Sequence, residues 1–67
     1  MTRDEGLAWL ASQGGGLKTQ TRDGVIRVLA FAHNLASSVV IQNLSDEPEL
    51  RRCELEAIVD LKQILDD

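Results

Sequence analysis

The chain has few of the residues that usually stabilise or equip a small protein. Its 67 residues include one Trp, one Phe and no Tyr, so a core must be built from aliphatic side chains. A single cysteine excludes an internal disulfide, and this length accommodates one domain, which we place at 1–67. Small aliphatic cores often need a partner for stability, so we expect a homo- or hetero-oligomer.

Several classes of function have little support in the sequence. No segment is long and apolar enough to span a membrane, and the first residues lack a signal-peptide pattern, so we expect a cytoplasmic protein without membrane contact. No His or second Cys lies at metal-ligand spacing from Cys53, so we expect no metal and no cofactor. His33 is the only histidine and is expected to serve as a turn residue, so we expect no catalytic residue and no enzyme.

Charge is distributed unevenly along the chain. The formal net charge is −4, which argues against a protein that binds nucleic acid by bulk electrostatics. Residues 1–45 hold four Lys/Arg and three Asp/Glu, whereas residues 46–67 hold three and eight. The acidic half is therefore one candidate surface for a cationic partner.

The first two thirds of the sequence predict a helix followed by strands. Thr2 and Glu5 have the spacing of a capping box, which predicts a helix over 3–12 that ends at Gly14-Gly15-Gly16. Strands are predicted at 17–22 and 25–32 around an Asp23-Gly24 turn, with a connection at 33–37 and a third strand at 38–44. Alternation along the second strand sets three apolar residues on one face and four on the other, so both faces are expected to be buried: Val25, Leu29 and Phe31 against Ile26, Val28, Ala30 and Ala32.

The segment 50–65 has two interpretations. As a helix, it aligns one apolar stripe: Leu50, Cys53, Ala57, Ile58, Leu61, Ile64 and Leu65. As a strand, it alternates apolar and polar residues from Cys53 to Leu61 with Ile58 as the only misfit. Helix propensity favours the first interpretation and periodicity slightly favours the second, so local pattern alone does not separate them.

The order of elements resembles the Sm/LSm (Sm-like, Hfq-related) family. The stretch 22–32 is similar to that family's first strand pair, 38–44 to its third strand and 61–64 to its short fifth strand. The resemblance implies a mainly β fold, in which an N-terminal helix precedes a small, strongly bent five-stranded antiparallel barrel. The alternative is an α+β fold of order αβββα with a C-terminal helix. The family's Asp-x-x-x-Asn loop and its Arg-Gly pair are absent, with Ala32 and Ala57-Ile58 in the corresponding places.

The resemblance also implies two sets of site residues. Subunits of that family join through their fourth and fifth strands, which here gives an interface of Cys53, Leu55, Ala57, Val59, Leu61 and Ile64. Weak RNA binding is expected at Lys18, Arg22, His33, Asn34 and Ser38. Further residues with the charge to contact phosphate are Arg27, Arg51 and Arg52.

Two functions follow from these patterns. The first is a non-catalytic Sm-like subunit that acts as an oligomeric structural or assembly module, with RNA or a ribonucleoprotein as an expected partner. The alternative is a small acidic interaction or inhibitor domain that binds a basic protein surface. A helix over 50–65 would favour the alternative, and strands would favour the first.

Overall fold

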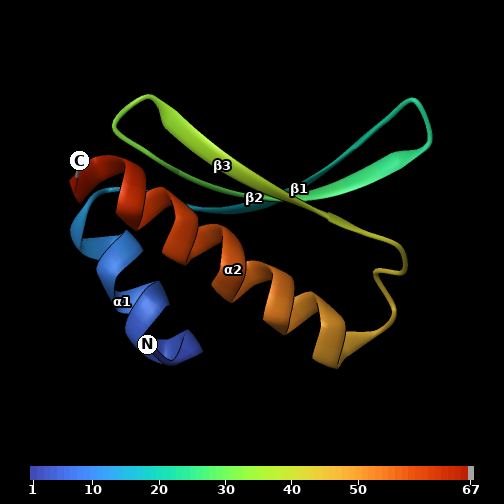
Figure 1. Cartoon of the computed structure of the whole chain (residues 1–67), viewed down its shortest axis with the longest axis horizontal. Coiled ribbons are helices and arrows are strands. Elements are labelled where there is room, and N and C mark those ends of the chain that lie inside the picture. Colours follow the sequence, from blue (N-terminus) through green and yellow to red (C-terminus); the bar gives the residue numbers. More distant parts are fainter. Residues whose placement is uncertain (67) are drawn as a thin grey trace.

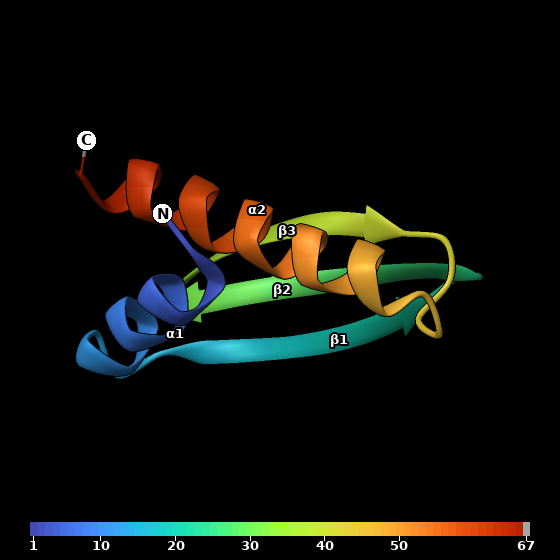
Figure 2. The ribbon, with the colours of Figure 1, turned by 90° about the horizontal axis from the view of Figure 1, so that it is seen from below.

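The computed structural model describes residues 1–66 and is an α+β domain of two layers (Figure 1). The three strands form one antiparallel sheet in the order β1-β2-β3. Both helices lie against the same face of this sheet, and the other face is uncovered (Figures 1 and 2). The elements are α1 (Arg3–Ser12), β1 (Gly16–Arg22), β2 (Val25–Ala32), β3 (Leu35–Ile41) and α2 (Glu47–Asp66).

The predicted N-terminal helix is confirmed with its capping box. The Glu5 amide donates to the Thr2 hydroxyl at 3.2 Å, and the Thr2 amide donates to the Glu5 carboxylate at 2.9 Å. Hydrogen bonds from the Thr2 backbone and hydroxyl lower the pKa of Glu5. At the other end, the Gly14 and Gly15 amides donate to the carbonyls of Ala11 and Leu10, which is a Schellman motif. The positive φ of 71° that Gly14 adopts is the reason a glycine ends the helix there.

Two tight turns connect the strands. Asp23 and Gly24 both have positive φ, as the sequence pattern predicts for a two-residue hairpin turn. His33 and Asn34 form a second turn of this kind, with φ values of 54° and 65°. The prediction of a short connection at 33–37 and a third strand at 38–44 is therefore wrong, since β3 begins at residue 35. Asn tolerates the left-handed conformation, and this allows the chain to reverse within two residues.

The barrel expected from the Sm-like resemblance is also wrong, because residues 47–66 form a single helix in place of two strands. The structure has an open three-stranded sheet and matches the αβββα alternative. Asp46 precedes the first residue of α2, and its carboxylate accepts a hydrogen bond from the Glu49 amide in the first turn at 3.2 Å. Its apolar stripe covers the sheet, so Cys53, Ala57 and Leu61 are completely buried. Ile58 separates the two structures: the helix buries it beside Cys53, Ala57 and Leu61, whereas a strand would place it on the polar face.

The core lies between the sheet and the two helices. One cluster joins Leu10 of α1 with residues of β2 and α2, and a second joins Val28, Ile41 and Cys53. Along β2, Val28, Ala30 and Ala32 are buried, which confirms the alternation that the sequence predicts for one of its two faces. The expectation that the other face is buried as well is wrong within this chain.

Among residues 1–66, no helix has the length and apolarity that a membrane crossing requires.

Candidate functional site

The uncovered side of the sheet is the candidate site, and we call it the open face. Strand register assigns its side chains, because residues paired across an antiparallel sheet project to the same side. Along β2, they alternate with the buried residues of the helix-covered face. The open face consists of Gly16, Lys18, Gln20 and Arg22 from β1, Val25, Arg27, Leu29 and Phe31 from β2, and Ala36, Ser38 and Val40 from β3.

The open face is positively charged although the whole chain is acidic. Lys18, Arg22 and Arg27 project from it, and the three strands contain no Asp or Glu. Within the part of the chain that the structure describes, none of these three cations takes part in an ion pair. The open face therefore has three cations that are free to contact an anion.

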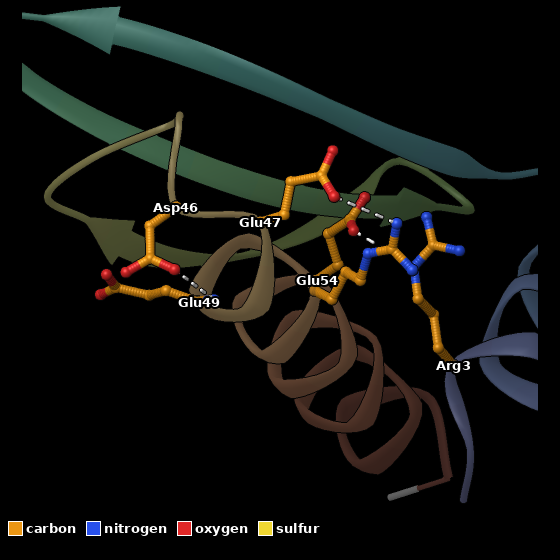
Figure 3. Close-up of polar contacts among 6 residues, drawn as sticks. Arg3, Asp46, Glu47, Glu49 and Glu54 are labelled. Atoms are coloured by element: carbon orange, nitrogen blue, oxygen red, sulfur yellow. Dashed lines mark hydrogen bonds and ion pairs between the residues drawn. The ribbon is translucent and has the colours of Figure 1, made fainter.

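The Lys and Arg side chains outside the open face are all paired. In the helix layer, Arg3 on α1 lies 3.3 Å from the carboxylate of Glu54 on α2 (Figure 3). Along α2, four further pairs link side chains three or four residues apart: Glu47 with Arg51 at 3.5 Å, Glu49 with Arg52 at 3.7 Å, Arg52 with Glu56 at 3.5 Å, and Lys62 with Asp66 at 2.9 Å. The acidic side chains of α2 are thus largely occupied by neighbouring cations.

Phe31 lies on the open face with small neighbours on both sides. Its cross-strand partners are Gly16 on β1 and Ala36 on β3. The ring covers Gly16, since a Cβ atom added there would lie only 3.2 Å from the ring's Cζ atom. The Lys18 ammonium lies over the ring, 5.6 Å from its centroid. Because 38% of Phe31 is exposed, its aromatic surface is accessible from solvent.

Gly15 fixes the backbone beside this ring. A Cβ atom at Gly15 would lie 2.0 Å from the carbonyl oxygen of Phe31, so only glycine allows the two segments to approach so closely. This approach holds the end of β2 against the segment that enters β1. The three consecutive glycines thus end α1, admit the Phe31 backbone and support the Phe31 ring.

The structure brings together some of the RNA-binding residues that the sequence predicts. Lys18, Arg22 and Ser38 all lie on the open face. His33 and Asn34 lie instead in the turn between β2 and β3, where the His33 Nε2 atom is 2.8 Å from the side-chain oxygen of Gln13. Sequence reasoning missed Phe31 as a site residue and considered Arg27 only as a phosphate contact. The alternation along β2 was the available signal, since it places Phe31 on the same face as Arg27 and opposite to the residues that are buried in the structure.

The residues predicted for a subunit interface are divided between the core and the surface. Cys53, Ala57 and Leu61 are buried under the sheet, and burial raises the pKa of the Cys53 thiol. Leu55 and Val59 are half-buried, and Ile64 is 48% exposed. The strands that were to form the contact are absent from residues 47–66. Subunit contact itself stays a prediction.

The open face offers a charged, partly apolar surface for binding. Across residues 1–66 there is no pocket and no cluster of three or more metal-ligating side chains. The exposed cations suit an extended polyanion, and the accessible ring suits a flat apolar group. Comparison with known proteins finds no matching family model, curated protein or solved structure.

Proposed function

We propose that the protein is a non-catalytic nucleic-acid-binding domain whose open face holds the phosphate backbone. The observation that supports this most is the division of the Lys and Arg side chains: Lys18, Arg22 and Arg27 share one face and form no ion pair within residues 1–66, whereas those elsewhere have acidic partners. Unpaired Lys and Arg on one face are the usual electrostatic footprint of a nucleic-acid site. We also propose a cytoplasmic location. RNA is the first partner to test.

The charge arrangement also favours an anionic partner over a second copy packed face to face. Two open faces in contact would bring six unpaired cations together, and like charges at an interface are costly. Outside the three strands the chain is strongly acidic, so a polyanion is repelled from the rest of the surface and directed to this one face.

The acidic-domain alternative has less support from the side-chain contacts. The helix that it requires is present as α2. However, Glu47, Glu49, Glu54, Glu56 and Asp66 each lie within 4 Å of an Arg or Lys of the same chain, so a basic protein would have to compete with these cations for the carboxylates.

Salt dependence tests the proposal directly. Fluorescence anisotropy would follow the binding of a labelled single-stranded RNA of about 12 nucleotides, a length typical of small binding domains. Three phosphate contacts give a slope of about −2 in a plot of log affinity against log salt, so affinity should fall roughly twenty-fold between about 50 and 200 mM salt. A matched single-stranded DNA provides the second arm and distinguishes RNA from DNA as the source of the phosphates.

Two results would contradict the proposal. One is the absence of binding to either oligonucleotide at about 50 mM salt, where charge contacts are strongest. The other is binding that does not change with salt. Binding of polylysine without binding of nucleic acid would support the acidic-domain alternative instead.

A further inference from the structure

We infer that the open face recognises single-stranded nucleic acid by stacking an unpaired base on the ring of Phe31. This inference rests on the proposed function, since the same face must hold the phosphates. It adds a substrate class, because only a strand with unpaired bases can place a base on a protein ring.

The surroundings of Phe31 give its ring an accessible surface. A large side chain at either cross-strand position would cover it, but these positions hold Gly16 and Ala36. Gly16 also allows the ring to lie over its backbone, because a Cβ atom at this position would be only 3.2 Å from the Cζ atom of Phe31. Phe31 is the only aromatic residue in the three strands, and Trp9 packs against the core cluster of the helix layer.

Lys18 occupies the place over the Phe31 ring that a stacked base would take. Its ammonium group lies over the ring at 5.6 Å from the centroid, and the residue is exposed. An exposed cation–π contact is weaker than the stacking of a base on an aromatic ring, so an incoming base displaces the ammonium group. The displaced Lys18 pairs with Leu29, two residues from Phe31 along β2, and is placed to contact the phosphate of the stacked nucleotide.

The other cations continue the site along the sheet. Arg27 is four residues from Phe31 on β2, which corresponds to about 13 Å in a strand. Arg22 pairs with Val25, a further two residues along β2. A strand that starts with a base on Phe31 and runs along β2 therefore meets Lys18, Arg27 and Arg22 in turn.

The experiment compares a normal strand with a strand that lacks bases. Anisotropy would measure the binding of oligo(dT) and of an abasic oligodeoxynucleotide of the same length, so that the number of phosphates is constant. A third oligonucleotide would contain 2-aminopurine, whose fluorescence falls when it stacks. We expect the wild-type protein to bind oligo(dT) about 5- to 150-fold more tightly than the abasic strand, which is the range for one stacked base. We also expect the 2-aminopurine signal to fall on binding.

Two variants assign the effect to the ring. Phe31→Leu keeps an apolar side chain without a π face, and it should bind oligo(dT) only as tightly as it binds the abasic strand. Phe31→Trp keeps a stacking surface and should retain the preference for oligo(dT). Circular dichroism establishes that both variants remain folded, which is expected because Phe31 is partly exposed.

The outcomes separate this inference from the proposed function. If the wild-type protein binds the two strands equally and Phe31→Leu changes nothing, stacking is refuted while phosphate binding stands. If no strand binds at all, the proposed function fails. A preference for oligo(dT) that Phe31→Leu leaves intact would also overturn the assignment to Phe31.

Discussion

Replacement of Lys18, Arg22 and Arg27 together by Gln should remove nearly all binding of nucleic acid. Each cation that is lost removes about 0.7 from the salt slope for a single strand, so the slope of the triple variant should approach zero. The fold should be unaffected, because none of the three side chains forms an ion pair within residues 1–66. Anisotropy at low salt measures the effect.

The chain offers a matched control for this variant. Arg51, Arg52 and Lys62 lie on α2, and their replacement by Gln changes the net charge by the same amount. Surface ion pairs of this type contribute about 0.3–0.5 kcal/mol each, so the control should remain folded. It should lose far less affinity for nucleic acid than the triple variant of the open face, because the three cations of the open face are kept. An equal loss of binding in the two variants would mean that net charge, and not the open face, determines affinity.

Leu61→Ala should unfold a large fraction of the protein. Leu61 is completely buried between α2 and the sheet, and removal of such a side chain costs about 2–5 kcal/mol. A domain of this size has a total stability of roughly 3–10 kcal/mol, so the loss is comparable with the whole. Urea unfolding followed by Trp9 fluorescence and circular dichroism measures the change in the free energy of unfolding.

Ile64→Ala is the control for the core prediction. Ile64 lies almost one turn further along α2 and is 48% exposed, so the cost in a monomer should stay below about 1 kcal/mol. If the predicted subunit contact forms through this residue, stability would instead depend on protein concentration and Ile64→Ala would lower it. Equal effects of the two substitutions at every concentration would contradict the placement of Leu61 in the core.

The sequence predicts the first half of this fold well, because its signals there are local. A capping box, a glycine helix stop and an Asp-Gly turn each depend on a few neighbouring residues, and all three are confirmed. The second turn was missed because His33 and Asn34 are not among the strongest hairpin dipeptides. That single error displaced the expected third strand by three residues.

The C-terminal segment could not be assigned from local pattern because its outcome depends on tertiary packing. Val28 and Ile41 need a cover on their side of the sheet, and α2 supplies it through Leu50 and Cys53. Three ion pairs at i,i+4 spacing add to the helix, which strand periodicity does not register. The family resemblance placed strands here and so gave the wrong fold.

The candidate site was only partly predictable, because it also depends on contacts between residues far apart in sequence. Lys18 and Arg22 could be placed on one face of a strand by alternation alone. The pairing of every Lys and Arg side chain outside the strands could not be predicted, because the contact of Arg3 with Glu54 joins residues far apart in sequence. It is this pairing that distinguishes the open face from the rest of the surface.

The most direct test of the central claim is a nuclear magnetic resonance titration of the isotope-labelled protein with single-stranded RNA. We expect the largest chemical-shift changes at the Phe31 ring, the Arg27 side chain and the β1 and β2 amides around Lys18, with little change along the outer side of α2. Changes concentrated on the acidic side chains of α2, or no saturable change in the sheet, would contradict the assignment of the open face as a nucleic-acid-binding surface.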